Sequence, residues 1–104
     1  MFIYNITFNI EESIQQEWLT WMHHFFVETI SFGNFISANI HQVLIKEEMG
    51  GVTYAVQFNT PTQETLKQFQ YQELTLLETQ MQQLFNGKYV FFHTELKMVT
   101  QFQP

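Results

Sequence analysis

The stretch "FIYNITFNIEESIQQEWLTWM" (residues 2–22) changes its hydrophobic period half-way along, and this change decides the fold. Over residues 2–10 apolar and polar side chains alternate, which predicts a half-buried β-strand. Over residues 12–29 the period becomes three to four residues, which predicts an amphipathic helix. The side chains that this helix is expected to turn toward the core are Ile14, Trp18, Trp21, Met22, Phe25 and Thr29.

A β-hairpin is predicted in the middle of the chain. The letters SFGNF (31–35) end the first helix, with Gly33 as its expected stop. Residues 36–46 alternate again, and so does VTYAVQFN (52–59). The charged, glycine-closed turn KEEMGG (46–51) lies between them, which predicts that the two strands pair.

The last third of the chain predicts a second helix and a fourth strand. TPTQ (60–63) places Thr60 at the N-cap and Pro61 at the first helical position. Glu73 interrupts the apolar stripe and indicates a local irregularity around the letters YQELT. The segment KYVFFHTELKMVT (88–100) predicts the last strand. The stripe of the second helix is expected to be Leu66, Phe69, Leu77, Met81 and Leu84.

The order of elements is therefore βαββαβ in one domain, residues 1–104. Each amphipathic helix needs an apolar partner, so both helices are expected to cover one face of a four-stranded antiparallel sheet. This is the ferredoxin-like α+β plan.

Composition excludes several classes of partner. Ten Glu and four Lys, with no Arg and no Asp, give a net charge of −6. Nucleic acids and anionic membranes both need clustered cations, so neither is an expected partner. Cysteine is absent, which excludes thiolate metal sites. We find no leader pattern and no apolar run of about 18 residues, and we expect a cytoplasmic protein without metal or cofactor.

The sheet face that the helices leave open is expected to mix polar and apolar side chains. Such a face suits a partly enclosed cleft, which two sheets stacked in a homodimer would form. The alternative is a solvated face with a few chance apolar residues. The same alternation places Val90, Phe92, Leu96 and Met98 of the last strand under the helices. The candidate ligand-binding residues on the open face are Asn5, Thr7, Asn39, His41, Gln57, Phe91, His93 and Glu95.

The four histidines differ in promise. Adjacent His23 and His24 diverge by about 100° on a helix, so they cannot chelate one ion together. His41 and His93 lie on the two predicted edge strands, about 14 Å apart within one subunit, and could converge only across a dimer. Glu95 lies two residues after His93 and could orient it as a general base. Cross-strand polar pairing inside a barrel is the competing interpretation.

The segments IYNITF, EWLTWM, GNF, GVTYAVQF and GKYVFFHTEL together resemble an uncharacterised bacterial domain-of-unknown-function family. At a greater distance, the architecture is similar to the antibiotic-biosynthesis monooxygenases. The resemblance implies a homodimer in which two ferredoxin-like subunits close an α/β barrel with their sheets face to face. It implies no reaction.

Three hypotheses for function follow. The first is a homodimeric barrel that binds a small aromatic or apolar ligand between its two sheets. The second is a small cofactor-independent monooxygenase or a haem-degrading enzyme. The third is a non-catalytic dimerisation module whose sheet face is fully used by the interface.

Overall fold

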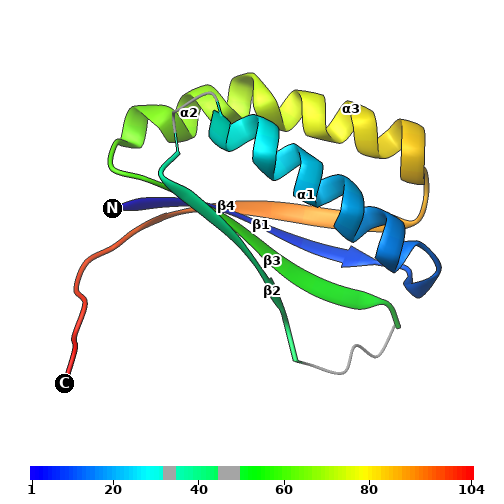
Figure 1. Ribbon diagram of the computed structural model, residues 1–104, viewed down its shortest axis with the longest axis horizontal. Helices are drawn as coiled ribbons and strands as arrows, with labels where there is room; N and C mark the ends of the chain where they lie inside the picture. Colours follow the sequence, from blue (N-terminus) through cyan, green and yellow to red (C-terminus); the bar gives the residue numbers. More distant parts are fainter. Residues whose placement is uncertain (32–34, 45–49) are drawn as a thin grey trace.

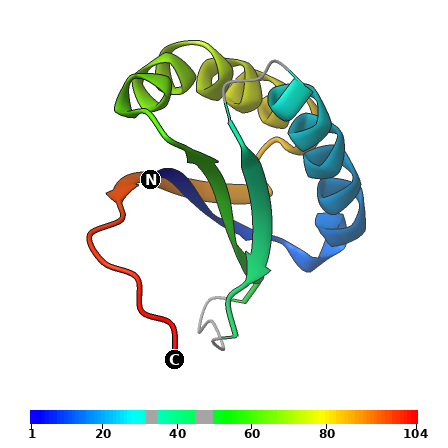
Figure 2. The same cartoon turned by 60° about the vertical axis from the view of Figure 1, so that its left-hand side comes forward.

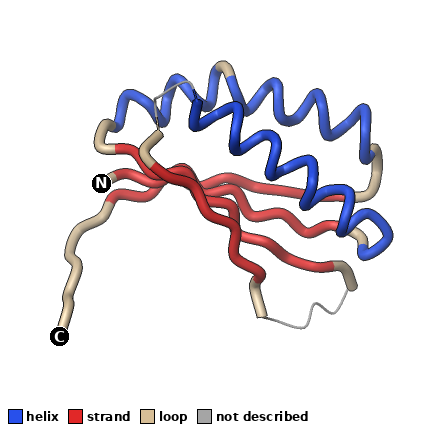
Figure 3. Tube along the Cα trace, viewed as in Figure 1, coloured by secondary structure: helices blue, strands red, loops and turns tan. Residues whose placement is uncertain are grey.

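The computed structural model describes residues 1–31, 35–44 and 50–104, and it confirms the ferredoxin-like plan. The sheet order is β2-β3-β1-β4 with every neighbouring pair antiparallel, so β2 and β4 are the edge strands. The helices lie on one face of this sheet (Figures 1 and 3). The elements are β1 (Phe2–Ile10), the 3-10 turn η1 (Glu12–Ile14), α1 (Gln15–Ser31), β2 (Ser37–Gln42), β3 (Val52–Thr60), α2 (Gln63–Tyr71), α3 (Glu73–Phe85) and β4 (Tyr89–Lys97).

The core lies between the helices and one face of the sheet. On β1 the predicted alternation is confirmed, and Tyr4, Ile6 and Phe8 are fully buried. Trp18 of α1 packs at the centre, with its ring centroid 5.1 Å from those of both Phe8 and Tyr54. Burying one large apolar side chain contributes about 1.5–3 kcal/mol, so this aromatic cluster accounts for a large share of the hydrophobic stabilisation.

The second helical segment is divided in two at Gln72. This residue has φ −105° and ψ −62°, and its N–H bonds to the carbonyl oxygens of both Gln68 and Phe69. Glu73 consequently begins α3, where its negative charge is favourable beside the helix N-terminus. The irregularity expected around YQELT is therefore confirmed, whereas the prediction of one long helix is wrong.

Helix α2 begins later than the sequence predicts. Its N-cap is Thr62 rather than Thr60. Thr60 instead completes β3, where it pairs with Phe2, and its Oγ1 accepts the N–H of Thr62 at 3.3 Å. Thr62 Oγ1 also lies 2.6 Å from Oγ1 of Thr65 in the first turn. Pairing with β1 keeps Thr60 in the sheet, so Pro61 precedes the helix instead of opening it.

Glycines occupy the sharp turns before β3 and after α3. Gly50 and Gly51 both have φ +82°, and Gly87 has φ +77°. A Cβ on Gly51 would lie 2.6 Å from Oδ1 of Asn9, so the close approach of β1 also requires glycine there. The glycine end of the hairpin turn is as predicted.

Strand β2 is shorter than the predicted residues 36–46. After β2 one more contact to β3 remains, in which the N–H of Val43 donates to the carbonyl oxygen of Thr53 at 2.8 Å. The predictions for Gly33 and for residues 45–49 lie outside the described residues. None of the helices that the structure describes is long and apolar enough to cross a membrane.

Candidate functional site

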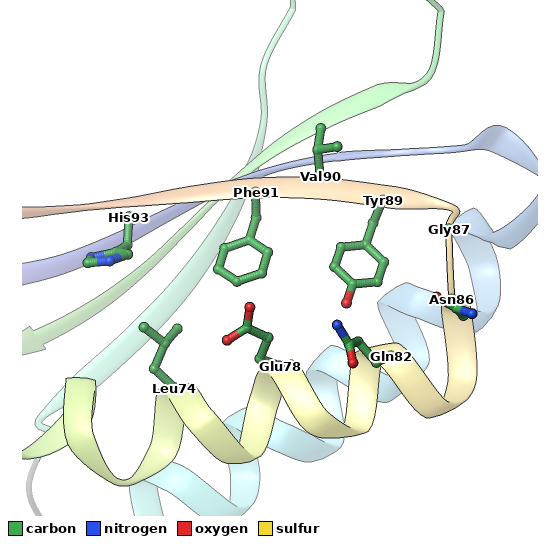
Figure 4. A pocket seen from close by; sticks show the side chains of 9 residues that line it. All are labelled: Leu74, Glu78, Gln82, Asn86, Gly87, Tyr89, Val90, Phe91 and His93. Atoms are coloured by element: carbon green, nitrogen blue, oxygen red, sulfur yellow. The ribbon is translucent and has the colours of Figure 1, made fainter.

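The strand register corrects which face of the sheet the last strand presents. Residues directly opposite each other in an antiparallel pair share a face, and β4 pairs Phe91 with Phe8, His93 with Ile6 and Glu95 with Tyr4. The β1 partners are core residues. Phe91, His93 and Glu95 therefore lie on the helix side, and the prediction that they lie on the open face is wrong. Figure 4 shows Phe91 and His93 directed toward α3 and Val90 directed away from it.

The sequence of β4 explains the error. A shift of one residue moves every side chain of a strand to the other face. Both phases of β4 contain large apolar side chains, and the phase with Val90, Phe92 and Leu96 contains more of them than the phase with Tyr89 and Phe91. Since β4 is an edge strand, the helices cover it incompletely, and His93 and Glu95 remain exposed on the helix side.

The other five predicted residues lie on the open face. Asn39, Gln57 and Asn5 are in register across β2, β3 and β1, and Thr94 of β4 continues the line, which we call the polar row. Gln57 Nε2 donates to Asn5 Oδ1 at 3.3 Å. Next to the row, Thr7 Oγ1 accepts from Asn5 Nδ2 at 3.2 Å. His41 and Thr7 also lie on this face, each opposite Ala55 of β3.

Asn39 differs from the rest of the polar row. Its Oδ1 is buried, yet it accepts no hydrogen bond from any residue in the part of the chain that the structure describes. A buried polar atom without a partner is unfavourable by about 1–3 kcal/mol. The hydrogen-bonding capacity of the polar row is therefore not fully used among the described residues.

The open face also has an apolar band on β4. Val90, Phe92 and Leu96 are 68%, 61% and 39% exposed, and Ile3 of β1 lies opposite Leu96. None of the helices that the structure describes lies over this face (Figure 2). We call Val90, Phe92 and Leu96 the β4 band. Contiguous exposed apolar surface of this kind marks an interface or a ligand site.

A groove lies between β4 and α3 on the helix side (Figure 4). Its volume is about 540 Å³, and we call it the β4–α3 groove. On the β4 wall, Tyr89 and Phe91 are stacked, with centroids 6.2 Å apart and planes at 23°. Glu78 and Gln82 project from α3 toward these rings. The lining residues are Leu74, Glu78, Gln82, Asn86, Gly87, Tyr89, Val90, Phe91 and His93.

His93 is tied to the core by Tyr4. The phenol oxygen of Tyr4 lies 3.0 Å from Nδ1 of His93, and the two rings stack with centroids 5.5 Å apart. Burial, with a smaller contribution from the charge of Glu95, raises the pKa of Tyr4 to about 12. The phenol therefore keeps its proton over the ordinary pH range, and its oxygen can donate a hydrogen bond to Nδ1 or accept one from it.

The four histidines do not come together in one site. His41 and His93 lie on opposite edges and opposite faces of the sheet, so one chain cannot bring them together. His23 and His24 are both exposed on α1, with ring centroids 6.5 Å apart. His24 lines a second groove of about 520 Å³ between α1 and α3. Within residues 1–31, 35–44 and 50–104, no three His or Glu side chains form a group that could hold a metal ion.

Sequence reasoning named Phe91 and His93 but missed the α3 residues of the β4–α3 groove and its neighbour Tyr89. Glu78 and Gln82 are ordinary polar positions of an amphipathic helix, and no motif connects them with β4. The available signal was the pair Tyr89 and Phe91, two aromatic rings in one phase of an edge strand, which suits a partly covered groove wall.

Comparison with known proteins places this fold in a family. Residues 1–99 match the model of a family described as a domain of unknown function, DUF4286. The chain belongs to the DUF4286 family. This confirms the resemblance found in the sequence. No curated protein matches this DUF4286 chain.

Solved structures share the fold of this DUF4286 domain. A dimeric ferredoxin-like protein from an uncultured marine organism has a TM-score of 0.70 at 10% identity, with 97% of each chain covered. A protein of Deinococcus radiodurans, named as a candidate antibiotic biosynthesis monooxygenase, has a TM-score of 0.69 at 8% identity, with 100% of each chain covered. A candidate monooxygenase of Shewanella loihica has a TM-score of 0.52 at 7% identity, with 96% of each chain covered. At these identities the likeness establishes the fold alone.

Proposed function

We propose that two copies of this chain pair through their open sheet faces into an α/β barrel that holds a small, mainly apolar or aromatic ligand beside the polar row. The observation that carries the proposal is the exposed β4 band on a face that none of the described helices covers. Single exposed apolar residues are ordinary, but three on one side of one strand are typical of an interface.

The charges of the open face support the same proposal. The strand register places no Lys and no Glu on this face within the four strands, and His41 is its one ionisable residue there. Interface cores are depleted of charged residues, because each charge would have to lose its hydration. None of the ten Glu and four Lys of this acidic chain is therefore among the strand residues of the open face.

The polar row is suited to selecting a ligand within such a barrel. Gln57 and Asn5 are neutral hydrogen-bonding groups surrounded by apolar and small polar neighbours, and Asn39 offers a buried acceptor with no described partner. Ligand sites commonly combine apolar walls with a few polar groups that fix orientation. A neutral molecule with a polar group would complement this row. The relative from a marine organism is described as dimeric, which agrees with the pairing.

Native mass spectrometry with sedimentation analysis tests both parts of the proposal. We expect a dimer, with a retained small molecule released on denaturation. Phe92→Glu should give a folded monomer, because it places a charge in the β4 band. Phe102→Glu is the matched control, since Phe102 is exposed in the segment after β4 and should leave the dimer intact. A wild-type monomer would overturn the pairing, and an empty dimer would overturn the ligand and favour the dimerisation module.

A further inference from the structure

The carboxylate of Glu78 projects into the β4–α3 groove toward the rings of Tyr89 and Phe91 (Figure 4). We propose that this groove is a second binding site, separate from the barrel interior, for a small organic cation: an ammonium group attached to a short apolar or aromatic body. The groove lies on the helix side of the sheet, so each chain contains a complete copy of it.

The charge of the groove is one-sided. Glu78 is the one acidic residue among the nine lining residues, and none of them is Lys. In the part of the chain that the structure describes, no hydrogen bond or ion pair joins Glu78 to another residue. Its charge does act on the groove, because it adds to burial in raising the pKa of Tyr89. An incoming cation would meet a carboxylate that no described residue binds.

The aromatic wall adds a second means of recognising a cation. Tyr89 and Phe91 stack at 6.2 Å, and Phe91 in turn packs against buried Phe8 with centroids 5.4 Å apart. The ring faces are therefore held in place before any ligand arrives. Ammonium groups bind over such faces by the cation–π interaction, and a carboxylate opposite the rings strengthens the preference for positive charge.

The other groups of the groove define the rest of the ligand. Gln82 and Asn86 provide neutral amides at the Tyr89 end. At the opposite end His93 is held by Tyr4 through Nδ1, which leaves Nε2 available to a ligand. The volume of about 540 Å³ falls within the range of small-molecule sites. An amine with an aromatic ring or a hydrogen-bond acceptor matches these features better than a carboxylic acid of the same size.

A pair of matched probes tests the charge preference. Two-dimensional NMR of the labelled protein would follow titrations with 2-phenylethylamine and with phenylacetate, which have the same ring and opposite charges. We expect saturable shifts at Tyr89, Phe91 and His93 with the amine and none with the acid. Glu78→Gln should weaken amine binding at least tenfold. Glu64→Gln, which removes one negative charge from α2 outside the groove, should leave binding unchanged.

Two results would overturn the proposal: equal shifts with phenylacetate, or the same amine affinity in Glu78→Gln as in the wild type. Phe92→Glu separates this site from the proposed barrel, because Phe92 lies on the opposite face. The folded Phe92→Glu monomer should bind the amine as the wild type does, and loss of binding would contradict a site contained in one chain. A wild-type monomer that binds the amine would overturn the barrel and leave the groove site standing.

Discussion

Tyr4 and His93, 89 positions apart in the chain, are joined by a 3.0 Å hydrogen bond between the Tyr4 phenol and Nδ1 of the imidazole. The bond connects a fully buried core residue with an exposed groove residue. The orientation of a groove residue is thus determined by the core.

Tyr4→Phe removes the phenol and keeps the ring. We expect the tautomer balance of His93 to change, because Nδ1 loses its hydrogen-bond partner. The loss of one hydrogen bond should also lower the free energy of unfolding by about 0.5–1.5 kcal/mol. Imidazole ¹⁵N shifts would measure the tautomer. Tyr71→Phe, at an exposed position of α2, is the control, and unchanged ¹⁵N shifts in Tyr4→Phe would contradict this hydrogen bond.

Alkaline pH should destabilise the fold through Tyr4. Its pKa of about 12 in the folded protein exceeds the ordinary value of 10.0, so the folded state holds its proton more tightly than the unfolded state. The stabilisation is present below pH 10 and is lost as pH rises from 10 to 12. Between pH 9 and 11 this amounts to about 1 kcal/mol. Urea denaturation measures the free energy of unfolding at both pH values. Between pH 9 and 11 it should fall by about 1 kcal/mol less in Tyr4→Phe than in the wild type, and equal decreases would refute the prediction.

Alanine variants of Gly51 and Gly50 separate the effect of backbone strain on stability from the effect of steric crowding. Both have φ +82°, but a Cβ on Gly51 would lie 2.6 Å from Asn9 Oδ1 and 2.9 Å from the carbonyl oxygen of Ile10. Around Gly50 the described residues leave the space open. Gly50→Ala should therefore lower the free energy of unfolding by about 1 kcal/mol through backbone strain alone. Gly51→Ala should lower it by about 1–3 kcal/mol more, and similar values for both variants would exclude the contact with β1.

Leu77 and Leu84 were both expected in the apolar stripe of the second helix. Leu77 is fully buried, whereas Leu84 is 58% exposed and Phe85 takes the core position beside it. Leu77→Ala should lower the free energy of unfolding by about 2–5 kcal/mol because it leaves a cavity. Leu84→Ala should change it by about 0.5 kcal/mol or less. Thermal or urea unfolding measures both, and equal effects would contradict the observed orientation of α3.

These residues also show what the sequence could predict. Strand β1 contrasts Tyr4, Ile6 and Phe8 with Asn5 and other polar residues, so alternation alone was enough to identify its core face. In the second helical segment, the break at Gln72 changes the position of the α3 residues around the helix axis relative to those of α2. A stripe extended through the break with a constant period therefore reaches Leu84 instead of its neighbour.

The candidate site was harder to predict because it depends on β4. Phe91 and Phe92 are equally apolar, so the phase of that strand is decided by its partners on β1 and not by its own pattern. The β4–α3 groove further needs Glu78, which approaches Tyr89 only after α3 packs beside the sheet. Contacts of this kind leave no periodic or motif signal in a sequence.

The absence of Lys and Glu from the open strand face has a consequence for salt. An interface without charged pairs loses nothing when ions screen electrostatic attraction. Two whole subunits, each with a net charge of −6, do repel each other, and screening weakens that repulsion. Self-association through this face should therefore become tighter as ionic strength rises, which sedimentation at low and high NaCl would detect. A pairing held by ion pairs would respond in the opposite direction.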